Sequence, residues 1–309
     1  MLDICLLGTG GTQPLMNRWL TSLMVRYQGR AVLIDCGEGT QIAAQRAGVS
    51  LKPIDKLLIT HLHADHISGL PGLLLSMGNA GRTEELSIIG PCGTERVVNA
   101  LRSIANNLPF EVRVSELETE EEDMYFRDCD IHAFSLKHRI ACYGYSICLP
   151  RAGKFDVQRA QAAGVPVRLW SRLQRGESVL HEGTLFTPDM VMGPPRKGLK
   201  VTYCTDTRPT PAISRAAAGS DLFICEGMYG DPEMLPKAKE KKHMLFTEAA
   251  QLAKDAGDVG ELWLTHYSPA MPNPKAWRDV ARAIFPATYT PRDGWCKTLA
   301  FNDEAPAGE

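Results

Sequence analysis

The chain has 309 residues, enough for one large domain or two small ones, and its 44% hydrophobic and 23% charged residues are typical of a globular protein. The net charge of -2 excludes a general attraction for polyanions, so binding of nucleic acid would need a local basic patch. Nine cysteines at scattered spacings, without a C-x-x-C pair, predict reduced thiols and a cytoplasmic protein. Because no apolar run reaches about 18 residues, we expect no membrane-spanning helix.

Short apolar segments alternate with helical patterns along most of the chain. The first residues read as a strand and not as a signal peptide. Further buried strands are predicted at 31–34, 56–60, 86–89, 201–205, 222–225 and 262–265, and helices at 41–47 and 246–256. This alternation predicts a layered α/β architecture.

Two segments interrupt the alternation. Residues 115–123 are acidic, which predicts a solvated surface loop or hairpin. Residues 150–200 are rich in Arg, Lys, Pro and Gly with few positions suited to a core, which predicts a basic insertion protruding from a single domain of residues 1–301. The polar residues 302–309 are expected to form a disordered tail.

A dense group of metal-binding residue types follows the strand predicted at 56–60. His61, His63, Asp65 and His66 lie within six positions and include three of the eight histidines of the chain. His61 and His63 would share one side of an extended strand end, and the next turn could direct Asp65 and His66 to a second ion. Imidazole nitrogens and carboxylate oxygens are ligands for zinc and its neighbours.

The same order of strand, threonine and potential ligand occurs three times. His61, Asp206 and His266 each follow a threonine that ends a predicted strand. Since ligands of layered α/β folds gather at the carboxyl ends of strands, these residues are candidates for one site. Taken alone, His138 fits a structural histidine better than a ligand, and we interpret His132 and His181 as structural.

The pattern His61-x-His63-x-Asp65-His66 resembles the signature of the metallo-β-lactamase superfamily. The resemblance implies a four-layered αββα sandwich with a dinuclear site at one edge, two zinc ions per subunit, and manganese or iron as alternatives. It implies that the first ion is bound by His61, His63 and His138, the second by Asp65, His66 and His266, and that Asp206 bridges them.

Within the superfamily the chain is most similar to the ribonuclease Z family, whose members remove the 3′ trailer of precursor tRNA and usually work as homodimers. The similarity is carried by segments 8–12, 35–41, 69–74, 143–145, 153–156, 193–196 and 206–209. In that family an arm grips the tRNA, which implies substrate-binding roles for Lys154, Arg159, Arg168, Arg172 and Arg175.

The chain departs from the family pattern at three places. The family's His-Glu-Ala-Thr motif is Cys-Glu-Gly-Met at 225–228, its Ser-x-Arg-Tyr motif is Ser-Pro-Ala-Met at 268–271, and its Gly-Pro pair in the arm is replaced near 166–168. The glutamate of the first motif, Glu226, is retained.

The resemblance also implies three catalytic roles. Asp65 would orient the attacking water and act as the base. His243, which precedes the helix predicted at 246–256, would be the general acid that protonates the leaving 3′ oxygen. Glu226 would hold the ring of His243 and favour its charged form. Without the resemblance, a surface histidine at a helix start fits His243 slightly better.

Other functions stay open at this point. One is hydrolysis of another phosphodiester or of a small ester, lactone or thioester by the same fold. A flavin-linked di-iron protein is disfavoured because its superfamily members carry glutamate at the position of His63. Dinucleotide binding, suggested by Gly8-x-Gly10 and Asp35, is disfavoured because Gln13 stands where the third glycine would be. A non-enzymatic nucleic-acid binder is disfavoured because all seven ligand positions are filled.

Overall fold

The computed structural model describes residues 1–301, so the tail expected at 302–309 lies outside the described residues. The chain forms two compact units: Met1–Cys148 together with the chain from Leu199 onward, and Leu149–Gly198. The second unit falls where the sequence analysis places the insertion, at 150–200. In the described part of the chain, no helix is long and apolar enough to span a membrane.

The first of two seven-stranded sheets is built mainly from the first 116 residues. Its strands run in the order β16-β1-β2-β3-β4-β5-β6, with antiparallel pairs as far as β3 and parallel pairs from β3 to β6. The strands are β1 Leu2–Gly8, β2 Ser22–Tyr27, β3 Arg30–Ile34, β4 Ile54–Leu58, β5 Leu86–Gly90, β6 Val112–Glu116 and β16 Trp295–Leu299.

The second sheet is built from the later part of the chain. Its order is β15-β14-β13-β12-β9-β8-β7, with parallel pairs from β12 to β15 and antiparallel pairs from β7 to β9. The strands are β7 Glu121–Phe126, β8 Cys129–Ser135, β9 Tyr143–Arg151, β12 Arg196–Cys204, β13 Leu222–Glu226, β14 Glu261–Thr265 and β15 Thr288–Tyr289.

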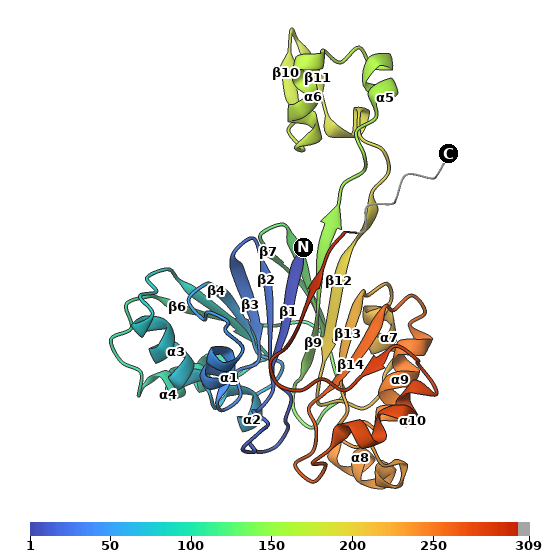
Figure 1. The fold of residues 1–309 in the computed structure, drawn as a ribbon. Helices are drawn as coiled ribbons and strands as arrows, with labels where there is room; N and C mark the ends of the chain where they lie inside the picture. Colours follow the sequence, from blue (N-terminus) through green and yellow to red (C-terminus); the bar gives the residue numbers. More distant parts are fainter. Residues whose placement is uncertain (302–309) are drawn as a thin grey trace. The chain divides into compact units, whose positions relative to one another are not determined.

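Helices cover the outer face of each sheet in the larger unit (Figure 1). The helices of the first half are α1 Thr40–Arg46, α2 Ala64–Ile67, α3 Leu70–Asn79 and α4 Thr94–Arg102. Those of the second half are α7 Pro211–Ala217, α8 Leu235–Lys241, α9 Phe246–Asp255 and α10 Arg278–Arg282, with 3-10 turns η2 Pro232–Met234 and η3 Pro274–Trp277.

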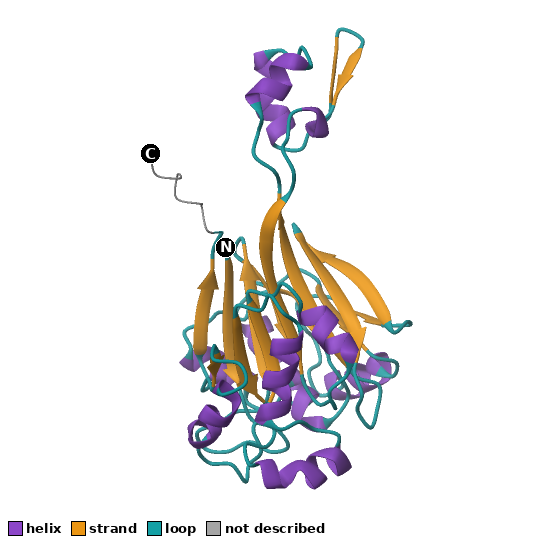
Figure 2. Cartoon of the chain, turned by 90° about the vertical axis from the view of Figure 1, so that its right-hand side faces the viewer, coloured by secondary structure: helices purple, strands orange, loops and turns teal. Residues whose placement is uncertain are grey.

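The layers follow from strands that are apolar on both faces. In one cluster, Leu73 of α3 packs with Leu57 and Ile88 of the first sheet, and in another Phe246 of α9 packs with Phe223 and Leu264 of the second. Figure 2 shows the helices of the second half in front of their strands. The larger unit is therefore the αββα sandwich expected from the sequence.

The smaller unit has a core of its own. Leu169 and Leu173, four residues apart on one helix face, are buried in a cluster with Phe186 and Val191. The expectation of few core positions in this segment was wrong. The elements of this unit are α5 Val157–Ala162, α6 Val167–Gln174, β10 Val179–His181, β11 Thr184–Phe186 and η1 Pro188–Met190.

Two smaller expectations also need correction. The strand predicted at 56–60 is β4, and it ends at Leu58 because the amide of Thr60 donates to the Asp35 carboxylate instead of to a neighbouring strand. Cys5 and Cys296 are not free thiols, since they face each other across β1 and β16 and form a disulfide. The sequence could not reveal this pair because 291 positions separate its members.

The acidic segment is only partly a loop. It includes the end of β6 and the start of β7, which belong to different sheets, and the hairpin is formed by β7 with β8. Glu118, Glu120, Glu121 and Asp123 are exposed, as expected for a solvated surface.

Candidate metal centre

Seven potential ligands meet where strands of both sheets end. His61, His63, Asp65 and His66 follow β4 of the first sheet. The ligand candidates from the second sheet are His138 after β8, Asp206 after β12 and His266 after β14. The site therefore lies between the two halves of the sandwich, at the edge where strand ends gather.

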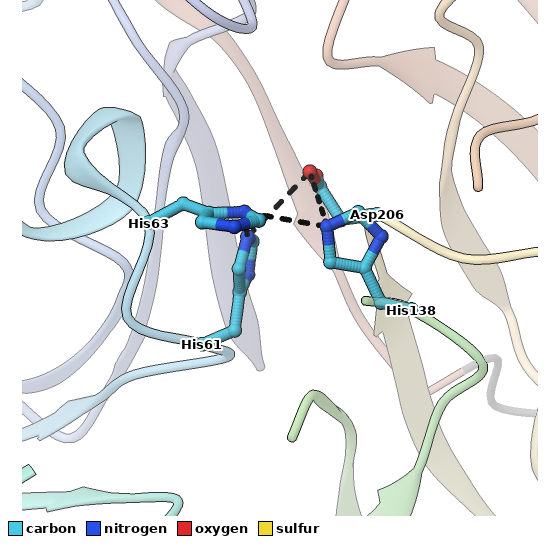
Figure 3. A group of neighbouring side chains, drawn as sticks. All are labelled: His61, His63, His138 and Asp206. Carbon is cyan, nitrogen blue, oxygen red and sulfur yellow. Dashed lines mark hydrogen bonds and ion pairs between the residues drawn. The ribbon is translucent and has the colours of Figure 1, made fainter. Parts of the chain in front are cut away.

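The first group of donors contains His61, His63, His138 and Asp206 (Figure 3). His63 presents Nδ1, which lies 3.0 Å from Nε2 of His61 and 3.3 Å from Nε2 of His138. The Oδ2 atom of Asp206 lies 3.5 Å from His61 Nε2 and 3.8 Å from His138 Nε2. All four residues offer a ligand atom within 4.8 Å of the others.

The second group contains Asp65, His66 and His266. The Nε2 atoms of His66 and His266 are 3.2 Å apart, and Asp65 Oδ2 lies 3.7 Å and 3.4 Å from them. The other carboxylate oxygen of Asp206, Oδ1, is 2.9 Å from His266 Nε2 and 3.3 Å from His66 Nε2. Asp206 thus turns one oxygen toward each group.

This donor set fits metal ions. Imidazole nitrogens that face each other at 3.0–3.3 Å leave lone pairs directed at a common point, which a cation satisfies better than shared protons do. The mixture of five imidazoles and two carboxylates is the kind that zinc and neighbouring metals prefer. The cluster is therefore a metal site.

Buried hydrogen bonds hold the rings in one tautomer. Asp35, with no exposed surface, accepts from His66 Nδ1 at 2.7 Å and from the Thr60 hydroxyl at 2.9 Å, and that hydroxyl lies 3.1 Å from His61 Nδ1. His138 Nδ1 faces the carbonyl oxygen of Lys242 at 3.3 Å. With Nδ1 protonated in each ring, Nε2 keeps its lone pair for a metal.

The electrostatics of the metal-free protein separate the two groups. Burial is the main cause that lowers the pKa of His61, His63 and His138, which favours the neutral ligand form. Burial alone would also lower the pKa of His266, but the carboxylates of Asp206 and Asp65 raise it to about 10. In the second group a metal ion must therefore displace a proton.

Residues of the loop after β1 contact the second group of ligand candidates. The Thr12 amide donates to Asp65 Oδ2 at 2.6 Å. A Cβ on Gly11 would lie 2.5 Å from Cε1 of His266, so only glycine fits beside that ring. Asp206 and His266 have φ of 40° and 56°, a left-handed conformation that Asp and His adopt more readily than most residues.

His243 and Glu226 form a pair beside the metal ligands. Glu226 is fully buried, and its Oε2 lies 3.2 Å from His243 Nδ1 and accepts from the Met244 amide at 3.1 Å. Burial lowers the pKa of His243, but Glu226, together with Asp206, outweighs this and raises the pKa overall. His243 also belongs to a donor group with Asp206 and His266. Its ring is 5.6 Å from that of His266.

The metal ligands open onto a cavity of about 650 Å³. The cavity is lined by ligand candidates of both donor groups and by His243. These residues are His63, Asp65, His138, Asp206, His243 and His266. Of the two histidines interpreted as structural, His132 pairs with Asp123 at 2.7 Å, and Nε2 of His181 lies 2.6 Å from Nη2 of Arg168. Neither belongs to a metal-binding group among residues 1–301.

The five basic residues predicted to bind substrate all belong to the smaller unit. Arg172 and Arg175 pair with Glu177, and Arg168 lies 3.7 Å from Glu182. Arg159 donates to backbone carbonyls of Met192 and Asp189, while Lys154 is exposed. Part of the basic charge of this unit is thus balanced internally.

Asp35 is the main functional candidate that the sequence analysis missed, since it was considered in a dinucleotide-binding pattern and within the segment 35–41 but not as part of the metal site. It follows directly after β3, as the ligands follow their strands. This position could have identified it as a member of the site.

Comparisons with known proteins agree with this geometry. The family model described as Anti-Pycsar protein Apyc1 matches residues 2–149. A protein of Agathobacter rectalis named Ribonuclease Z is 57% identical over 304 residues, covering 98% of this chain and all of that one. Human tRNase Z, short form, has a TM-score of 0.70 at 22% identity, covering 97% of this chain and 100% of the human one. The metallo-beta-lactamase fold protein YhfI from Bacillus subtilis has a TM-score of 0.68 at 18% identity, covering 96% of this chain and 98% of that one.

Proposed function

The chain belongs to the ribonuclease Z family, and on this premise we propose that it removes the 3′ trailer of precursor tRNA with two zinc ions bound per subunit. It is a metal-dependent endoribonuclease. The observation that carries the two-ion proposal is the orientation of Asp206, whose two carboxylate oxygens face the two donor groups.

The ligands divide as the donor groups do. His61, His63 and His138 would hold one ion, Asp65, His66 and His266 the other, and Asp206 both. When bound, such ions lower the pKa of water and neutralise the charge that develops on a phosphate. Zinc suits a set dominated by imidazole, and manganese or iron would be accepted by the same donors.

Two side chains that line the cavity would act on the reacting groups, and a buried third, Glu226, would act through one of them. Asp65, fixed by the Thr12 amide, would orient the attacking water and accept its proton. His243 would donate a proton to the leaving 3′ oxygen. Glu226 would keep His243 charged until that transfer, because its carboxylate raises the pKa of the imidazole.

The proposal also covers the role of the smaller unit, the oligomeric state and the location of the protein in the cell. The smaller unit would contact the phosphates of the tRNA body. This is supported by five basic residues that all belong to it, Lys154, Arg159, Arg168, Arg172 and Arg175. Family membership supports a homodimer, which light scattering of the purified protein would test. A tRNA substrate and seven free thiols within residues 1–301 support action in the cytoplasm.

The experiment is cleavage of a tRNA that carries a 3′ trailer, with and without a chelator, followed by mapping of both products. We expect one cut at the trailer junction that a chelator abolishes and zinc restores. A matched His243→Ala variant should keep both metals, by elemental analysis, and lose most turnover. Cleavage of bis-p-nitrophenyl phosphate without any cleavage of the precursor would refute the proposed substrate and favour another phosphodiester.

A further inference from the structure

One side of the metal cavity carries positive charge that the proposed chemistry does not use. Lys237 and Lys241 of α8 and Arg139 of the loop after β8 all line the cavity. The two lysines are four residues apart, so they share one face of the helix. Lys239, between them, does not line the cavity.

Lys237 is connected to the proposed general acid through an aromatic ring. Its ammonium lies 5.7 Å above the ring of Tyr229, which is 8% exposed and also lines the cavity. The ring of Tyr229 is in edge contact with that of His243, with centroids 6.5 Å apart. The charge of Lys237 is therefore on the side of the cavity where the leaving group would be protonated.

The other two cations are held loosely enough to accept a ligand. Lys241 pairs with Glu240 at 2.8 Å, but both side chains are largely exposed, and such a pair contributes little. Arg139 donates from Nη2 to the carbonyl oxygen of Glu240, which places its guanidinium beside α8. A phosphate oxygen could replace Glu240 as the partner of Lys241 at small cost.

Another part of the cavity wall carries no such charge. Ser268, Pro269 and Ala270 line it, and they occupy the segment where the family's Ser-x-Arg-Tyr motif would supply an arginine. The buried Arg18 donates to the carbonyls of Ser268 and Met271, so its guanidinium is used to hold this segment. Among the described residues that line the cavity, the lysine and arginine side chains are therefore those of Lys237, Lys241 and Arg139.

We propose that Lys237, Lys241 and Arg139 form a phosphate subsite that binds the RNA backbone on the 5′ side of the scissile bond. This side is assigned because Lys237 contacts the ring of Tyr229, which in turn contacts His243, and His243 would protonate the 3′ oxygen of the 5′ product. The inference rests on the proposed function. It identifies which part of the substrate the α8 face recognises.

The test combines RNA substrates in which one linkage is uncharged with protein variants in which lysines are replaced by alanine. Precursor tRNAs would carry one methylphosphonate linkage either 5′ or 3′ of the scissile phosphate, and kcat/KM would be measured for wild type, Lys237→Ala/Lys241→Ala and the control Lys239→Ala. We expect the 5′ linkage to reduce cleavage by wild type and by the control about tenfold, and to have little further effect on the double variant. Equal losses from the 5′ linkage in all three proteins would overturn the subsite.

Binding of the 5′ product gives a readout that does not depend on turnover. The double variant should bind mature tRNA roughly tenfold more weakly at 0.15 M salt, and its slope of log affinity against log salt should be smaller by about 2. Lys237→Arg/Lys241→Arg should restore both. An unchanged salt slope in the double variant would reject the phosphate contacts. Failure of wild type to cleave the precursor would instead reject the proposed function, so the two failures are distinguishable.

Discussion

Replacing Asp35 by Asn tests whether a buried carboxylate sets the metal affinity of the site. Asp35 has φ of 61°, and asparagine tolerates this left-handed conformation, so the substitution removes the charge with little backbone strain. The new amide can accept from the Thr60 amide with its oxygen. Its NH2 group then faces His66 Nδ1, where the carboxylate accepts at 2.7 Å.

A loss of metal affinity is expected because two hydrogen-bond donors, the new amide NH2 and His66 Nδ1, would face each other. His66 must either lose its hydrogen bond or move its proton to Nε2, the atom that faces His266 and the metal position. Loss of a carboxylate that orients a metal-binding histidine typically lowers metal affinity by about 10- to 100-fold, or roughly 1.4–2.7 kcal/mol. The second group should lose more than the first, because His61 contacts Asp35 only through Thr60.

Competition titration of metal-free protein with zinc and a chromophoric chelator would measure both affinities. Asp128→Asn is the control, since Asp128 is an exposed carboxylate that accepts from Tyr27 on the surface. Thermal unfolding of the metal-free proteins shows whether the substitution destabilises the whole fold. If it does not, a loss of zinc affinity reflects misoriented ligands. If Asp35→Asn bound two zinc ions as tightly as the control, the proposed orientation of His66 would be wrong.

Three further predictions concern the same cluster. Gly11→Ala should displace the His266 ring and reduce zinc binding from two ions to one, whereas two ions by elemental analysis would contradict the steric argument. Glu226→Gln should lower the pKa of His243, so the basic limb of the kcat/KM profile should move to lower pH. A limb at the wild-type pH would remove Glu226 from this role. In the metal-free protein the pKa of His266 is about 10 and the pKa of His66 is raised well above its usual range, so both rings hold a proton that a metal must displace, and affinity at the second group should rise by at least about tenfold per pH unit between pH 7 and 9. Calorimetry in buffers of different ionisation enthalpy should find that binding at the second group releases protons, and zero release would contradict the assignment.

The sequence predicted the strand ends that carry ligands because two local signals coincide there. A buried strand gives a continuous apolar run, and the threonines at 60, 205 and 265 are fully buried beside the ligands that follow them. These patterns are local, so one sequence suffices to find them. They also predicted that the ligand candidates after these threonines would converge on one site.

Features that depend on distant pairing were not predictable in this way. The disulfide between Cys5 and Cys296 depends on the register of β1 against β16, which no local pattern encodes. The role of Asp35 depends on the position of His66, 31 residues later. The core of the smaller unit was overlooked because basic residues outnumber acidic ones in it and Pro and Gly interrupt it, although Leu169 and Leu173 had helical spacing.

The division of the donors between two sheets has a consequence for biosynthesis. A nascent chain that has emerged as far as His66 carries four of the seven ligand candidates, but Asp206, which faces both groups, comes 140 positions later and His266 later still. Until the second sheet assembles against the first, an ion bound by the early histidines would be held weakly and exchange readily. Durable metal capture is thereby coupled to completion of the sandwich.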